Sequence, residues 1–154
     1  MEQKIIRTLN VYYYGIMVLT LLAGTLAYFL IMKNYVLPID SLSSLGQTIQ
    51  YVVIFDALLT IPLGLYLCKK QCIKLCALEN EEEKLIGYKK AATARIILVG
   101  NTMIFAIAAF YLMGAYQSML WVAAVSAIGW YFTKPSARKM ELELQPKDPN
   151  VENY

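Results

Sequence analysis

The sequence has no histidine among its 154 residues. Histidine is the commonest general base near neutral pH and a frequent ligand of zinc and haem, so its absence excludes the usual form of all three kinds of site. Charged residues are also scarce, at 16% of the chain, compared with about 25% in ordinary globular domains. The chain lacks the basic and aromatic pattern of a nucleic-acid-binding module, and we expect no nucleic-acid partner.

What the chain has in abundance is long apolar runs, and 58% of its residues are hydrophobic. These runs cover residues 9–32, 49–68, 91–113 and 117–133. About 20 consecutive apolar residues are enough for a helix to cross the hydrocarbon core of a bilayer. The sequence therefore predicts an all-α membrane protein, with four transmembrane helices in an antiparallel bundle over residues 1–133. The first run is too long for the core of a signal peptide, and we expect it to be retained.

Lysine and arginine are unevenly distributed among the segments that connect these runs. Of the 14 basic residues, only Lys33 lies between the first and second runs, and none lies between the third and fourth. By the positive-inside rule, both termini and the segment 69–90 are expected in the cytoplasm. The predicted location is the plasma (inner) membrane. The lipid bilayer is the expected partner, together with a second copy of the chain or another membrane protein.

The segment between the second and third runs has the pattern of a helical hairpin. It contains no proline, and Asn80 is followed three residues later by Glu83, which is close to a capping box. We therefore expect a tight turn at residues 79–80 and a helix that begins near Glu81. This hairpin, over about residues 69–90, is predicted to protrude into the cytoplasm.

The C-terminal tail, residues 134–154, is expected to form a cytoplasmic segment of its own. One or two amphipathic helical turns are predicted over residues 136–145. The remainder is rich in proline, aspartate and asparagine, and we expect it to be disordered.

The three cysteines, Cys68, Cys72 and Cys76, follow one another at intervals of four residues. On a helix this spacing places them on one face. Three interpretations are open: packing in the hairpin seam, reversible acylation near the membrane, and a metal site. Packing is favoured because cysteine behaves as a small apolar side chain, here facing Leu85, Tyr88 and Ala92. A tetrahedral metal site lacks a histidine or fourth cysteine, so we expect no metal and no other cofactor.

One carboxylate lies inside an apolar run, in the stretch VVIFDALLTIPLG of residues 52–64. At about 1.5 Å per helical residue, Asp56 lies roughly 10 Å below the outer membrane surface. An ionised aspartate costs about 2.5–3.5 kcal/mol in a membrane helix on insertion scales, so it is expected to face the bundle or a wet cavity. Pro62 leaves the carbonyl of Leu58 without its helical hydrogen bond.

Three polar side chains lie at or near the predicted depth of Asp56. They are Thr60 on the same helix and Thr25 and Tyr28 on the first helix. Together with Asp56 they form a candidate proton or ion site, or alternatively a structural hydrogen-bond network. Asn101, near the middle of the third run, is expected to make an interhelical polar contact.

These patterns leave three classes of function open. The favoured class is a non-enzymatic membrane subunit or scaffold that acts through its cytoplasmic hairpin and tail. The alternative is a small proton- or ion-coupled transporter that uses intramembrane Asp56. A membrane enzyme is disfavoured, because the sequence shows no nucleophile–base pair and the thiols are expected in a reducing compartment.

Overall fold

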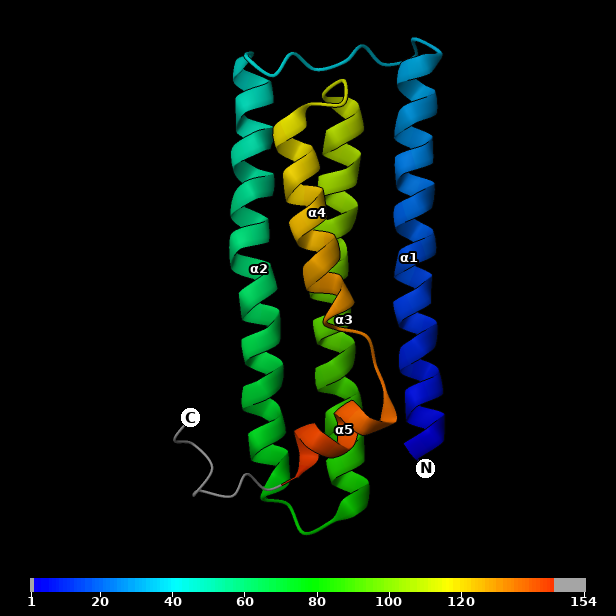
Figure 1. Ribbon diagram of the computed structural model, residues 1–154, viewed down its shortest axis with the longest axis vertical. Helices are drawn as coiled ribbons and strands as arrows, with labels where there is room; N and C mark the ends of the chain where they lie inside the picture. Colours follow the sequence, from blue (N-terminus) through cyan, green and yellow to red (C-terminus); the bar gives the residue numbers. More distant parts are fainter. Residues whose placement is uncertain (1, 146–154) are drawn as a thin grey trace.

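The computed structural model describes residues 2–145, which fold into five helices (Figure 1). The helices are α1 (Glu2–Met32), α2 (Ser44–Cys76), α3 (Glu81–Leu112), α4 (Gln117–Tyr131) and α5 (Ala137–Leu144). The predicted all-α class is confirmed for this part of the chain.

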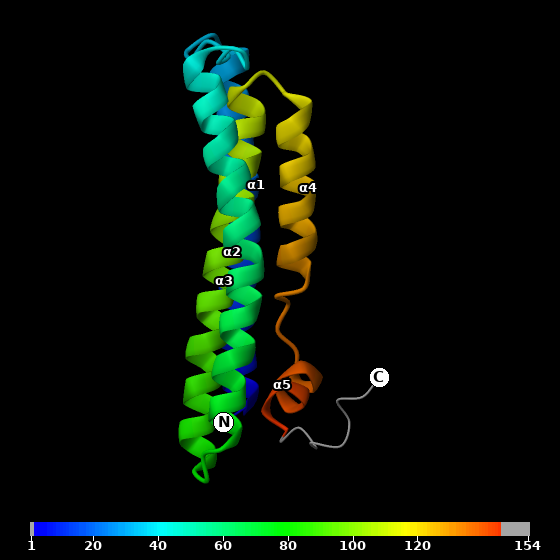
Figure 2. The same ribbon diagram turned by 90° about the vertical axis from the view of Figure 1, so that its left-hand side faces the viewer.

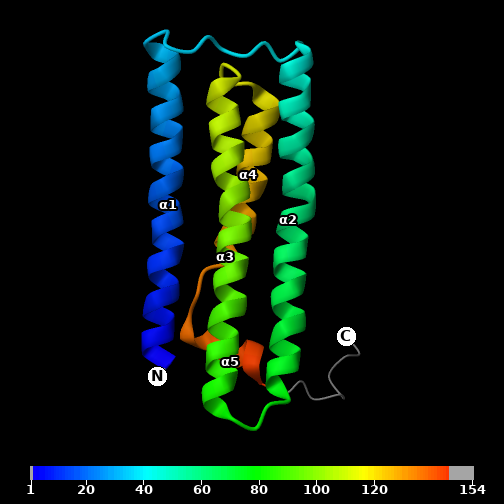
Figure 3. The same cartoon turned by 180° about the vertical axis from the view of Figure 1, so that it is seen from behind.

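The central element is α3. Helices α1, α2 and α4 each pack against it, and Figures 1 and 3 show α1 and α2 on opposite sides of it. Many of its buried residues are small, including Ala92, Gly100 and Ala106, and small residues let helix backbones approach closely. A Cβ atom added to Gly100 would lie 2.6 Å from Cγ2 of Ile16 in α1. The bundle is therefore built around one helix, and its members are not equivalent.

Three of the helices are long and apolar enough to cross a membrane, which supports a membrane location. Helices α1, α2 and α3 contain 31, 33 and 32 residues, or about 47–50 Å at 1.5 Å per residue. Their outer faces carry exposed apolar side chains such as Leu22, Leu58 and Phe105. Helix α4 is shorter, with 15 residues, and spans about 22 Å.

A short turn joins α2 to α3 at the end of the molecule that also holds the start of α1 (Figure 1). Helix α2 runs through Pro62 and ends at Cys76, and α3 begins at Glu81. The side chain of Asn80 accepts a hydrogen bond from the backbone N–H of Glu82 at 3.0 Å. The cap is therefore Asn80, as the sequence predicts, although its backbone partner is one residue earlier than in a capping box.

Helix α5 lies at the same end and contacts α2 and α1. Figure 2 shows α4 and α5 on one side of the layer formed by the three long helices. The side chain of Ser136 caps α5 by accepting a hydrogen bond from the backbone N–H of Lys139, and Met140 is buried in the bundle core. The helical part of the tail is thus docked onto the bundle. Residues 146–154, for which disorder is predicted, lie outside the described residues.

Candidate functional site

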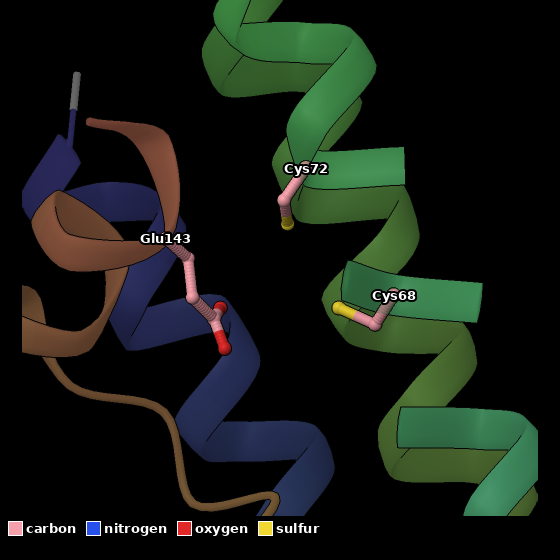
Figure 4. Close-up of side chains that lie close together, drawn as sticks. All are labelled: Cys68, Cys72 and Glu143. Atoms are coloured by element: carbon pink, nitrogen blue, oxygen red, sulfur yellow. The ribbon is translucent and has the colours of Figure 1, made fainter. Parts of the chain in front are cut away.

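Polar side chains from three helices meet where α5 packs against α2 and reaches α3 through an ion pair. We call them the thiol–carboxylate cluster: Cys68 and Cys72 of α2, Tyr88 and Arg95 of α3, and Glu143 of α5. The two sulfur atoms and a carboxylate oxygen of Glu143 all lie within 4.8 Å of one another. Figure 4 shows both thiols and the carboxylate turned toward the same space.

An ion pair holds α5 against α3. Nη1 of Arg95 donates a hydrogen bond to Oε1 of Glu143 at 2.8 Å. The side chain of Arg95 is only 4% exposed and that of Glu143 is 24% exposed. A buried charge is strongly destabilising unless it is paired, so the carboxylate from the tail compensates the arginine in the central helix.

Several polar atoms of the cluster are buried without a hydrogen-bond partner among residues 2–145. They are the hydroxyl of Tyr88, Nε and Nη2 of Arg95, and Oε2 of Glu143. Most buried polar groups in proteins are paired with protein, water or an ion. Four such atoms in one place mark the cluster as a candidate site, because water and ions are the usual partners of buried polar groups that protein atoms leave unpaired.

The surroundings of the cluster favour the protonated forms of the Cys72 thiol and the Tyr88 hydroxyl. A hydrogen bond with the Cys68 sulfur, together with burial, raises the pKa of the Cys72 thiol. Burial and the negative charge of Glu143 raise the pKa of Tyr88. Burial and the positive charge of Arg95 lower the pKa of Lys139, whose ammonium group donates to the carbonyl of Phe132. Without a further cation, Cys72 and Tyr88 therefore remain protonated near neutral pH.

The three cysteines of α2 divide into a buried pair and a partly exposed thiol. Cys68 and Cys72 are buried, whereas Cys76 is partly exposed at the end of α2. The sulfur of Cys76 lies 3.7 Å from the backbone carbonyl oxygen of Glu143. The buried pair shares a core with the side chains that the packing interpretation names, Leu85, Tyr88 and Ala92.

Asp56 lies on the outer side of α2. Thr60 donates a hydrogen bond to its Oδ1 at 2.8 Å, and its Oδ2 is buried without a partner in the described part of the chain. The pair borders an open hollow of about 490 Å³ whose lining residues all belong to α2: Tyr51, Val52, Phe55, Asp56, Leu59 and Thr60. The carboxyl group thus lies in a shallow outer hollow, and the structure joins it to Thr60 alone of its predicted neighbours.

The other residues of the candidate polar site are placed elsewhere. The hydroxyl of Thr25 donates to the carbonyl of Leu21 in its own helix, and the ring of Tyr28 packs against that of Tyr111 in α3. Asn101 is exposed on α3, and its amide makes no hydrogen bond within residues 2–145. The interhelical contact predicted for Asn101 is therefore not formed within this part of the chain.

Arg95 and Glu143 are the functional candidates that sequence reasoning missed. They are 48 positions apart, and neither has a local pattern that points to the other. One signal is present in the tail, where Met140 and Leu144 are four residues apart and mark an apolar face beside Glu143. The pairing itself depends on how the tail folds back, which no local spacing encodes.

Comparisons with models of known protein families, with curated proteins and with solved structures gave no match for this chain. The chemistry of the chain's own residues is therefore the basis for assigning its function.

Proposed function

We propose that the protein is a non-enzymatic membrane subunit or scaffold whose working surface is the end formed by the α2–α3 turn and α5. The observation that carries this proposal is the Arg95–Glu143 ion pair at 2.8 Å. It fixes the tail helix at the end of the bundle that holds the α2–α3 turn, so the exposed side of α5 has a defined position there.

The lengths of the helices support a placement of this surface outside the bilayer. Helices of about 47–50 Å exceed a hydrocarbon core of about 30 Å by roughly 15–20 Å. Thirteen of the 14 basic residues, all except Lys33, lie near the termini or the α2–α3 connection. We place this end in the cytoplasm by the positive-inside rule, with both termini inside and α4 as a fourth, shorter crossing of the plasma membrane.

Two hollows on the part of the chain that the structure describes support contact with lipid or protein more than passage of a solute. One is the α2 hollow that contains Asp56. The other, of about 480 Å³, lies on the outside and is lined by residues that include Tyr12, Lys89 and Lys90. Such surfaces suit a second copy of the chain, another membrane protein or lipid headgroups.

Site-specific photocross-linking in native membranes tests the proposal. A photoreactive residue at Leu78, in the turn, or at Leu142, on the exposed side of α5, should give a discrete protein adduct. The same residue at Leu22, on the lipid-facing side of α1, is the control and should give lipid adducts only. The proposal fails if neither working-surface position yields a protein adduct, or if Leu22 yields the same adduct.

The second candidate function is a small proton- or ion-coupled transporter. It is favoured by one observation, the buried and unpaired Oδ2 of Asp56 next to Thr60. Because the hollow opens away from the bundle, a second copy of the chain would have to enclose it. Melting curves measured across acid to mildly alkaline pH for the wild type and Asp56→Asn test this candidate. Superimposed pH dependences would remove it, since a working site must titrate or bind a cation.

A further inference from the structure

We propose that Cys68, Cys72 and Glu143 form a binding site for a divalent transition metal of the zinc type. The site goes beyond the proposed scaffold function and does not depend on it. Its ligand set differs from the one that cysteine spacing alone offers, because Glu143 replaces Cys76.

The geometry of the three donors is close to that of a bound ion. The sulfur atoms and the Glu143 oxygen lie within 4.8 Å of one another, and Figure 4 shows them converging on one space. Zinc binds thiolate sulfur at about 2.3 Å and carboxylate oxygen at about 2.0–2.2 Å, which sets tetrahedral donors roughly 3.5–3.8 Å apart. A closure of about 1 Å by side-chain rotation completes the set.

The carboxylate has one oxygen for the protein and one for the metal. Oε1 of Glu143 accepts the hydrogen bond from Arg95, and Oε2 is buried without a partner within the described residues. Metal-binding carboxylates are commonly held by a hydrogen bond of this kind from an outer residue. The arrangement leaves Oε2 as the ligand atom and Arg95 as a positioning residue. The hydroxyl of Tyr88 is buried beside the same carboxylate, where it can donate a hydrogen bond to a metal-bound water in the fourth position.

The charges balance when a divalent ion is bound. Binding breaks the S–H bonds of Cys68 and Cys72, releases two protons to solvent, and forms two metal–sulfur bonds and one metal–oxygen bond. Two thiolates and Glu143 carry −3, Arg95 carries +1 and the ion carries +2, so these five groups sum to zero. Lys139, which interacts with Glu143 and Cys68, adds one positive charge at the edge of the site. Thiolate ligands favour zinc, cadmium and similar ions over magnesium or calcium.

A disulfide is a poor alternative for the same two cysteines. Residues four apart on a helix have Cβ atoms about 5–6 Å apart, whereas a disulfide needs about 3.5–4.5 Å. Helix α2 is continuous from Ser44 to Cys76, so the pair stays as two thiols that are available as ligands. Because the third ligand comes from α5, the metal joins the tail to the hairpin base.

Cobalt and zinc titrations of the purified, reduced, chelator-stripped full-length protein test the site. We expect one Co²⁺ per chain with a thiolate-to-cobalt charge-transfer band, displacement by Zn²⁺, and release of two protons per ion in weak buffer. Cys72→Ser should weaken cobalt binding by more than about 100-fold, because loss of an outer-shell partner alone costs about 10–100-fold. Glu143→Gln should weaken it at least about 10-fold.

Cys76→Ser is the matched control, since Cys76 lies on the same helix four residues beyond Cys72 and outside the buried pair. It should bind cobalt like the wild type. The proposal is overturned if the wild type shows no charge-transfer band, if Cys76→Ser loses as much affinity as Cys72→Ser, or if Glu143→Gln binds unchanged. If a variant does not fold, the wild type still tests the proposal: absence of the charge-transfer band overturns it, and one Co²⁺ per chain with two protons released supports a two-thiolate site.

Discussion

At the residue scale, Arg95 shows how a charge is accommodated at the edge of an apolar bundle. Its side chain is buried, it pairs with Glu143 at 2.8 Å, and both belong to the thiol–carboxylate cluster. The stability of the fold depends on that partner, because an unpaired buried charge destabilises a protein by more than a buried ion pair stabilises it.

Removing one member of this pair should destabilise the folded protein. In chelator-treated protein, Glu143→Gln should lower the free energy of unfolding by about 3 kcal/mol, the low end of the range for broken buried pairs, because Glu143 keeps some exposure. Titration with a denaturing detergent measures the change. The double variant Arg95→Met, Glu143→Leu should lose much less than the sum of the two single changes, and additive losses would contradict the pairing.

The matched control for that experiment is Glu81→Gln. It breaks the pair between Lys84 and Glu81, which has a similar N–O distance of 2.9 Å but only one well-shielded partner: the Lys84 side chain is 15% exposed and that of Glu81 is 76% exposed. Exposed pairs contribute less than about 1 kcal/mol, so this variant should unfold almost like the wild type.

Tyr88 predicts a pH dependence of stability. Burial and the nearby Glu143 carboxylate raise the pKa of its hydroxyl in the folded protein, whereas in the unfolded chain it ionises near its ordinary pKa of about 10. Above that pH the unfolded chain loses a proton that the folded protein retains, so stability falls as pH rises. Tyr88→Phe should show a shallower fall between pH 9 and 11.5, measured as unfolding midpoints. Parallel curves for the two proteins would show that Tyr88 ionises equally in both states.

At the element scale, the positions of the helices could be read from the sequence but their rotations could not. The apolar runs of α1, α2 and α3 and the Asn80 cap follow from local composition. Asp56 was expected to face the bundle or a wet cavity, and it borders an open hollow on the outer side of α2. Because α2 is apolar almost all round, no apolar stripe in the sequence shows which side packs. The docking of α5 could not be predicted from the sequence either, because the Arg95–Glu143 contact joins residues that are 48 positions apart.

The close approach of α1 to α3 predicts opposite effects at two glycines. A Cβ atom at Gly100 would lie 2.6 and 2.8 Å from side-chain atoms of Ile16, whereas at Gly15 no atom lies within 4 Å. Alanine is favoured over glycine in a helix by up to about 1 kcal/mol, so Gly15→Ala should be neutral or stabilising. Gly100→Ala should destabilise by about 1–3 kcal/mol through overpacking. Melting temperatures in detergent compare the two.

A compensating change identifies the cause. Ile16→Ala should relieve the crowding and recover part of the loss in the Gly100→Ala background. If Gly100→Ala and Gly15→Ala behave alike, the two helices are further apart than described.

At the scale of the whole molecule, one end of the bundle carries α5 and most of the basic residues, and the other carries the α1–α2 loop and the short α3–α4 turn. The loop between α1 and α2 carries Lys33 alone among the basic residues. This asymmetry, together with three helices longer than a bilayer core, orients the proposed scaffold.

Labelling in intact cells tests that orientation. A cysteine at Leu37, in the exposed loop, should react with a membrane-impermeant thiol reagent, and one at Arg138 in α5 should react only after the cells are opened. The wild type, with its three native cysteines at the basic end, is the control and should not label in intact cells. The reverse pattern would place the thiol–carboxylate cluster outside.

The central position of α3 has a consequence for how the chain is held together. Helix α1 packs on α3 and stacks Tyr13 on Trp130 at 3.9 Å, while its covalent link to α2 runs through an outer loop that bonds to α3 through Ile39 N–H and Leu112 O. The loop therefore acts as a tether that raises the effective concentration of α1 near its packing surface on α3. Two copies of the chain that exchange their first helices keep the packing of α1 on α3 and the stacking of Tyr13 on Trp130, so α1 is the element through which this fold can swap.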